Sequence, residues 1–209
     1  MSQVERHKRL RLLVKQLNRR RKQQAHKIDI LCHDLVAAQR QFMRKLNDVG
    51  FAAHFYKELL GASDLRTLLT RAGRLLREEL PGAEVAFFLR QLDGYERHLV
   101  EGNKELDLAT LRLHDGFTAE LVDNISKANR LCTSEDLCGM GLLANPAELA
   151  ALSVATVPLN DMGRSLGFVL ICRAEPDALP RDELEKIGLI TCGLSRAVRG
   201  CNVPLPSQG

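Results

Sequence analysis

The chain has 209 residues, a formal net charge of +4 and a hydrophobic share of 45%. This length accommodates one domain of roughly 150 residues plus an extended arm, and the composition argues against a disordered chain. No stretch of about 18 apolar residues occurs and the amino terminus is charged, so we expect no membrane span, no export signal and a cytoplasmic protein. The six cysteines are scattered, and in the cytoplasm we expect reduced thiols.

The first fifty residues carry a hydrophobic repeat with a spacing of about 3.5 residues. No proline or glycine occurs before Gly50, which predicts one long helix over residues 1–50. Because one helix cannot bury a narrow apolar seam against itself, we expect a coiled coil with a second copy of the chain. The seam residues are Leu10, Leu13, Val14, Leu17, Ile28, Leu31, Leu35, Ala38, Phe42, Leu46 and Val49.

The same helix is strongly basic. Between Glu5 and Lys27, ten lysines or arginines accompany one glutamate. The run Arg19, Arg20, Arg21 and Lys22 has the charge needed to contact phosphates of nucleic acid, although a solvated helix face is the simpler interpretation and nucleic acid is not the favoured partner. Arg20 or Arg21 falls in the seam together with Gln24, so we expect weak pairing there that also sets the register.

Residues 51–200 predict a second domain that mixes helices and strands. A helix continues to Gly61, and the next begins after Ser63 or Asp64, which can accept hydrogen bonds from free amides of its first turn. Strands are expected in two hairpins, at 84–90 with 95–100 and at 153–159 with 166–172. Further helices are expected at 65–80, 116–129, 146–152 and 180–199. We expect a loop at 132–141 and a disordered tail at 201–209.

The second hairpin resembles the GAF domain family. Its strands read Ala155-Thr156-Val157-Pro158-Leu159 and, after a turn, Ser165-Leu166-Gly167-Phe168-Val169-Leu170, followed by a helix that begins near Asp182. The resemblance implies an α+β fold, with a six-stranded antiparallel sheet flanked by helices and preceded here by the coiled-coil helix. It also implies dimers through helical stalks, and a ligand cavity under loops on one face of the sheet.

The resemblance further implies which residues line that cavity, although the ligand and any cofactor remain unknown. The candidates from strands and loops that face the cavity in the family are Arg90, His114, Phe117, Thr133, Thr156 and Arg173. The cyclic-nucleotide signature is missing, because Asn103-Lys104 is not followed by the required Phe, Asp and Glu. Bilin-bearing relatives need a Cys beside a His, and here Cys32-His33 lies in the stalk helix instead.

Cys132 and Cys138 flank a loop that borders the cavity in the family. They loosely resemble the cysteines of the methionine sulfoxide reductase branch, which leaves a cysteine-based redox enzyme as an alternative. A metal site would need a further ligand such as His114, and Cys-x5-Cys is not a strong metal signature. Buried, inert thiols are the simpler interpretation.

No sequence motif for catalysis is visible elsewhere. The chain has no phosphate-binding glycine loop and no Ser-His-Asp set, and His33-Asp34-Leu35 matches a phospho-acceptor box only in part. We therefore predict a non-enzymatic, homodimeric sensor that binds a small molecule or relays a signal to a partner protein in trans. A dimerisation scaffold with a degenerate pocket is the other alternative.

Overall fold

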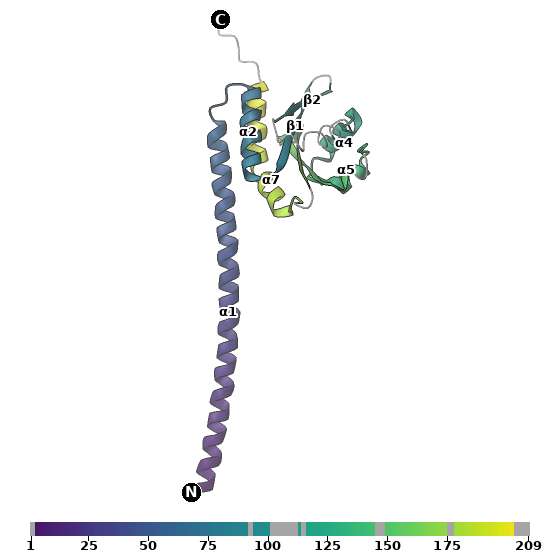
Figure 1. The fold of residues 1–209 in the computed structure, drawn as a ribbon. Helices are drawn as coiled ribbons and strands as arrows, with labels where there is room; N and C mark the ends of the chain where they lie inside the picture. The colour runs from purple at the N-terminus through teal and green to yellow at the C-terminus, as the bar shows by residue number, and fades with distance from the viewer. Residues whose placement is uncertain are drawn as a thin grey trace. The chain divides into compact units, whose positions relative to one another are not determined.

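The computed structural model describes residues 3–91, 94–100, 113, 116–144, 149–174 and 178–202. The chain forms two compact units, Met1–Val49 and Gly50–Gly209. Helix α1 (Gln3–Leu59) contributes residues to both units (Figure 1). Among the helices of the described residues, none has the length and apolar character needed to cross a membrane.

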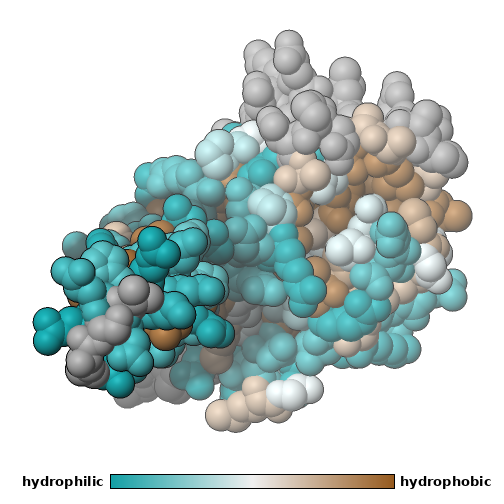
Figure 2. All heavy atoms as spheres, turned by 90° about the horizontal axis from the view of Figure 1, so that it is seen from below, coloured by the Kyte–Doolittle hydropathy of each residue, from teal (hydrophilic) through white to brown (hydrophobic). Residues whose placement is uncertain are grey.

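The first unit is a helical part of α1 whose hydrophobic residues are exposed. Leu31, Leu35 and Phe42 keep 66%, 69% and 65% of their surface accessible in the single chain. The space-filling view from below shows hydrophobic as well as hydrophilic residues at the surface (Figure 2). The residues expected to form a seam are therefore available to a second helix, and their pairing stays a prediction.

The second unit is built on a five-stranded antiparallel sheet with the order β2-β1-β5-β4-β3. The strands are β1 (Ala83–Gln91), β2 (Gly94–Leu99), β3 (Cys132–Thr133), β4 (Leu152–Asp161) and β5 (Arg164–Ala174). The two predicted hairpins are confirmed as β1–β2 and β4–β5. The α+β architecture is also confirmed, although five strands rather than six occur among the described residues.

A tight turn joins β4 to β5. Met162 and Gly163 both adopt positive φ angles, 48° and 79°. Two successive residues with positive φ are typical of the turn that matches the twist of an antiparallel hairpin. The turn therefore aligns Leu159 with Gly167 across the hairpin, with an irregularity after Leu159.

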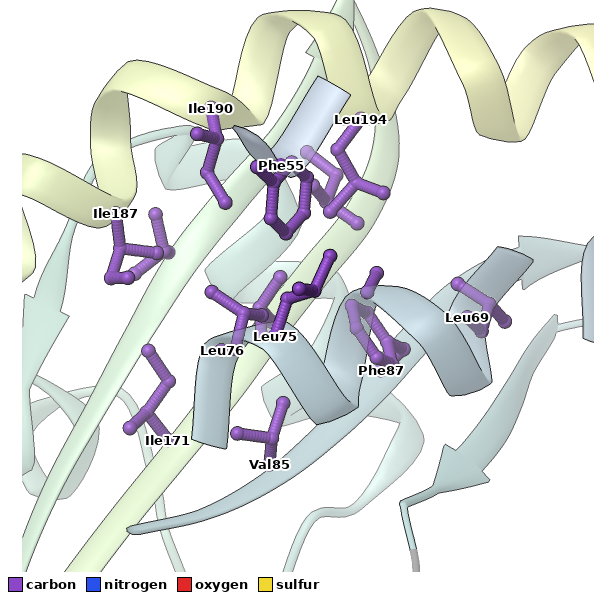
Figure 3. Close-up of a cluster of buried hydrophobic side chains, with 14 of the residues drawn as sticks. Phe55, Leu69, Leu75, Leu76, Val85, Phe87, Ile171, Ile187, Ile190 and Leu194 are labelled. Carbon is purple, nitrogen blue, oxygen red and sulfur yellow. The ribbon is translucent and has the colours of Figure 1, made fainter. Parts of the chain in front are cut away.

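Helices α2 (Leu65–Glu79) and α7 (Arg181–Asn202) lie side by side against one face of the sheet (Figure 1). Their apolar faces follow the helical period and pack on alternate strand residues such as Val85, Phe87 and Ile171. Phe55, from the last turns of α1, is fully buried among them, beside Ile190 and Leu194 (Figure 3). The end of α1 is thus part of the core of the second unit.

Helix α2 begins where the sequence predicts. Asp64 is its N-cap: one carboxylate oxygen accepts a hydrogen bond from the backbone amide of Thr67 at 2.8 Å, and the other accepts one from the Thr67 hydroxyl at 2.7 Å. These bonds favour the ionised carboxylate and lower the pKa of Asp64 below its ordinary value.

Three expectations need correction or lie outside the described residues. The expected loop at 132–141 contains β3 and a short helix, α5 (Ser134–Gly139). The helix forms because the Asp136 carboxylate, in its first turn, accepts a hydrogen bond from the backbone amide of the N-cap residue Thr133. Leu152 belongs to β4 rather than to a helix at 146–152, and residues 145–148 are not described. Helix α7 continues through residues 201 and 202, where the tail was expected to begin, and residues 203–209 are not described.

Candidate functional site

The other face of the sheet carries a second apolar cluster under helices α4 (Ala119–Ala128) and α5. Helix α4 is held in place at both ends. The Thr118 side chain accepts a hydrogen bond from the Leu121 amide at 3.2 Å, and Asn129 ends the helix in the left-handed conformation. Leu121, Val122, Ile125 and Ser126 then point toward the sheet and are buried.

Three phenylalanines form the aromatic part of this face. The ring centroids of Phe88 on β1 and Phe168 on β5 are 4.8 Å apart and nearly parallel. Phe117 lies 5.2 Å from Phe88 and 6.2 Å from Phe168. Such contacts add to the stability of an apolar cluster and also provide a flat surface for the face of a ligand.

Buried hydroxyl groups lie on the same face. Thr156 Oγ1 and Ser126 Oγ are both buried and have no hydrogen-bond partner among the described residues. The Tyr95 hydroxyl, on the strand β2 side of the cluster, is in the same state. A buried hydroxyl without a partner costs about 1–3 kcal/mol, so a group that supplies the missing bond would be bound favourably.

Cys132 pairs with Thr156 across strands β3 and β4, so the two side chains point to the same face. The thiol is fully buried and donates to the backbone oxygen of Arg130 at 3.4 Å, while the Thr156 hydroxyl lies near it without hydrogen-bond geometry. Burial raises the pKa of the Cys132 thiol above its ordinary value. The neutral thiol is therefore favoured, which suits a packing residue better than a nucleophile.

Cys138 differs from Cys132 because it is exposed on α5. All the cysteines are free thiols, and the described residues contain no cluster of three or more metal-ligating side chains. His114, the third ligand considered for a metal, lies outside the described residues.

Thr133 takes part in a capping network at the start of α5. Its amide and hydroxyl both donate to Asp136 Oδ2, at 3.0 Å and 3.3 Å, and Arg130 Nη2 lies 2.7 Å from Asp136 Oδ1. The hydrogen bond from Arg130 and then the Thr133 amide lower the pKa of Asp136 to about 2. Thr133 is exposed, and its hydroxyl is engaged in the cap.

The other predicted site residues are dispersed. Arg173 lies on the opposite face of the sheet, where its guanidinium forms an ion pair of 3.0 Å with Glu183 of α7. Arg90 is exposed near the end of β1. Arg19, Arg20, Arg21 and Lys22 are exposed on α1 in the first unit. The structure thus brings Phe117 and Thr156 together with Cys132, and does not bring Arg173 to them.

Ser126 and Phe168 are not among the site residues predicted from the sequence, although Phe168 belongs to the strand that carries the family resemblance. Ser126 follows Ile125 on the apolar face of α4, and a serine at a buried helical position is a signal that could have identified it. Phe168 alternates with Val169 along β5, which places these neighbours on opposite faces.

No family model and no curated protein sequence matches this chain. Solved structures do match its fold. The GAF domain of a phosphoenolpyruvate-protein phosphotransferase from Coxiella burnetii is 19% identical, with a TM-score of 0.56, and the match covers 74% of this chain and 94% of that one. The GAF domain of a putative sensor histidine kinase from Pseudomonas syringae pv. tomato is 15% identical, with a TM-score of 0.53, covering 78% and 94%.

An enzyme also shares the fold. The type II free methionine-R-sulfoxide reductase from Thermoplasma acidophilum is 17% identical, with a TM-score of 0.50, and the match covers 68% of this chain and 96% of that one. Sheet order, flanking helices and these matches agree on one architecture. The second unit of this chain has the GAF fold.

Proposed function

We propose that this protein is a homodimeric GAF-type sensor, in which a small molecule bound at the α4 face changes the signal passed to a partner protein in trans. The observation that carries the proposal is the course of α1. Its last turns pack in the domain core against α7, and α7 packs against β4, the strand that carries Thr156. The same helix therefore carries the exposed seam and, with its last turns, contributes to the core of the domain.

The ligand proposal rests on the chemistry of the α4 face. Phe117 and Phe168 offer aromatic surface, and the hydroxyls of Thr156 and Ser126 have no hydrogen-bond partner within the part of the chain that the structure describes. A small molecule with an apolar part and a hydrogen-bonding group would satisfy both features. GAF domains generally serve as sensor modules, and one of the matched structures is the GAF domain of a putative sensor histidine kinase.

The dimer proposal rests on heptad spacing. Val14, Arg21, Ile28, Leu35, Phe42 and Val49 fall seven residues apart, and Leu10, Leu17, Gln24, Leu31 and Ala38 form the complementary set. Apolar residues at both series of positions over several heptads are typical of a coiled coil. Polar residues at these positions in a single heptad fix the register of the two helices and lower the stability of the pair. We assign residues 1–50 to this stalk and residues 51–200 to the sensor domain, in a cytoplasmic protein.

The signal would travel through packing contacts. A ligand that binds one arrangement of α4, α7 and the sheet more tightly than another shifts the balance between them by that difference in affinity. Because Phe55 and Tyr56 of α1 lie against α7, a shift of α7 changes the environment of the stalk's last turns. The partner protein would respond to the resulting change in the stalk.

The redox-enzyme alternative is supported by the fold of the methionine sulfoxide reductase alone. The buried, neutral Cys132 argues against it, because a nucleophilic cysteine needs a thiolate. A scaffold with a filled pocket is the remaining alternative, and it differs from the sensor in having no small-molecule response.

Native mass spectrometry of the purified full chain, followed by thermal unfolding with a panel of metabolites, tests the proposal. We expect a dimer, and at least one compound that raises the unfolding temperature of the wild type but not of the Thr156→Val variant. Cys138→Ser, an exposed change on α5, is the control and keeps the response. A monomer at micromolar concentration, or the absence of any stabilising compound, would overturn the sensor. Methionine sulfoxide reduction lost in Cys132→Ser and Cys138→Ser would establish the enzyme.

A further inference from the structure

A concave surface lies between helix α2 and strand β2, away from the cluster under α4. It is a groove of about 930 Å³ lined by both elements. The basic groove, as we name it, is formed by Leu65, Arg66, Leu69, Thr70, Arg74, Arg77, Glu96, Arg97, His98, Leu99 and Val100. It belongs entirely to the second unit, and none of its residues is among the site residues predicted from the sequence.

The charge of the groove is strongly one-sided. Four arginines and His98 line it, with Glu96 as the single acidic lining residue. Glu96 is itself engaged, because Gln91 Nε2 donates to its Oε2 at 2.8 Å and His98 Nε2 lies 3.4 Å from its Oε1. Arg66 and Arg97 are exposed. The groove therefore offers positive charge to an acidic group.

One wall of the groove is the edge of the sheet. Among the described residues, β2 pairs only with β1. The amide of Val100 donates to Val85 of β1 at 3.3 Å, and backbone groups alternate sides along a strand, so those of Leu99 and Arg97 point away from β1. The side chains of Arg97 and Leu99, like that of Tyr95, face the opposite side of the sheet from α2. Arg97 and Leu99 nevertheless line the groove.

The floor of the groove is apolar. Leu65 and Leu69 lie one turn apart on α2, and Leu69 is buried while Leu65 is half-buried. Arg66, Thr70, Arg74 and Arg77 follow on the neighbouring stripe of the same helix, at spacings of four, four and three residues. The groove thus combines a strand edge that has no partner among the described residues, an apolar floor and a basic rim.

From this combination we infer that the basic groove binds an extended, acidic segment of a partner protein, which adds to the sheet as a strand beside β2. Strand addition satisfies the outward amides and carbonyls of Arg97 and Leu99, and the apolar floor accepts alternate side chains of the segment. Glutamates or aspartates of the segment pair with Arg66 and Arg97. Nucleic acid fits less well, because the described lining residues offer one aromatic ring for a base to stack on, that of His98, and this ring lies beside the Glu96 carboxylate, with Nε2 3.4 Å from Oε1.

Fluorescence anisotropy of the full chain tests this inference. The probes are a fluorescein-labelled peptide of alternating glutamate and valine, a lysine-valine peptide and a single-stranded oligothymidylate. We expect the acidic peptide to bind and the basic peptide not to bind. The double variant Arg66→Glu, Arg97→Glu should weaken binding by at least about tenfold. The matched control Arg164→Glu, Arg196→Glu makes the same change of charge at exposed sites outside the groove and should leave binding unchanged.

The variant Leu99→Pro tests strand addition separately from charge. Proline removes an amide that points away from β1 and is tolerated on edge strands, so the sheet should survive while binding weakens by about fivefold or more. Thermal unfolding of each variant verifies the fold. Equal binding by Leu99→Pro and wild type would overturn strand addition. Tighter binding of the oligothymidylate than of the acidic peptide, or no loss in the Arg66→Glu, Arg97→Glu variant, would overturn the inference.

Discussion

The hydroxyl of Tyr56, on α1, donates a hydrogen bond to the backbone oxygen of Leu189, on α7, over 3.0 Å. The tyrosine ring reaches α7 because residue 193 is glycine: a Cβ atom there would overlap the ring of Tyr56. Nearby, the Lys186 ammonium lies 5.0 Å from the centroid of the Phe51 ring and pairs with Glu79 of α2. Three helices of the second unit are therefore joined at one place.

The first prediction concerns this contact. Gly193→Ala should destabilise the protein by about 1–3 kcal/mol, because the added methyl displaces the Tyr56 ring. Gly188→Ala, five residues earlier on α7 and in open space, should stabilise it by up to about 1 kcal/mol, since alanine favours helix more than glycine does. Urea unfolding of both variants measures the difference. Equal effects of the two changes would show that α1 does not pack on α7 as described.

The second prediction concerns Gly167 on β5. This residue has a φ of 131°, and a Cβ atom would collide with the backbone oxygen of Phe88 on the neighbouring strand. Gly167→Ala should therefore destabilise the protein by about 3 kcal/mol or more, or prevent folding. Gly139→Ala, where the Cβ meets open space, is the control and should change the stability by less than about 1 kcal/mol. Circular dichroism and urea unfolding compare the two.

The third prediction concerns pH. Asp136 has a pKa of about 2 in the folded protein and an ordinary value of 3.8, so the folded state favours the ionised carboxylate. The stability from this group is present above pH 4 and is lost as the pH falls toward 2. The unfolding temperature of wild type should therefore exceed that of Asp136→Asn above pH 4, and the difference should shrink by pH 2. A difference that is independent of pH would contradict the ionised cap.

How far the sequence predicts this structure depends on whether a signal is local. The helix and strand periodicities, a helix cap at Ser63 or Asp64 and the hairpin around Gly167 are local signals. The structure confirms them, with Asp64 as the cap. The helix α5 was missed although Thr133 and Asp136 have the spacing of a capping box.

The candidate site was less predictable, because the face to which a strand residue points depends on register. Thr156 and Phe117 lie on one face with Cys132, whereas Arg173 lies on the other with Glu183. That Thr156 and Phe117 line a ligand cavity stays a prediction. The candidate residues are far apart in sequence. A shift of one residue along a strand turns a side chain to the opposite face of the sheet. The ion pair between Arg173 and Glu183 depends on where α7 packs against the sheet. The sequence of β5 alone does not indicate that position.

The fourth prediction concerns the buried hydroxyl of Thr156. In the absence of ligand, Thr156→Val should leave the stability unchanged or raise it, because the hydroxyl has no partner among the described residues and valine has the same shape. Cys132→Ser should lower the stability by about 1–3 kcal/mol, since it places a hydroxyl where a fully buried thiol packs. Urea unfolding of the apo protein gives both values. A strong loss of stability in Thr156→Val would show that the hydroxyl has a structural partner.

The last prediction concerns the polar heptad of the stalk. Arg21 and Gln24 occupy positions that are apolar in the heptads on either side, and all of them are exposed in the single chain. If the stalks pair, the two Arg21 side chains face each other, and the like charges weaken the dimer at this point. Arg21→Leu with Gln24→Leu should then tighten dimerisation at least tenfold, and Leu35→Lys with Phe42→Lys should abolish it. Analytical ultracentrifugation over a range of concentrations measures both, with Arg19→Leu as a control for the loss of a positive charge outside these positions. Tightening by Arg19→Leu equal to that of the double leucine variant would show that net charge, rather than the seam, limits pairing.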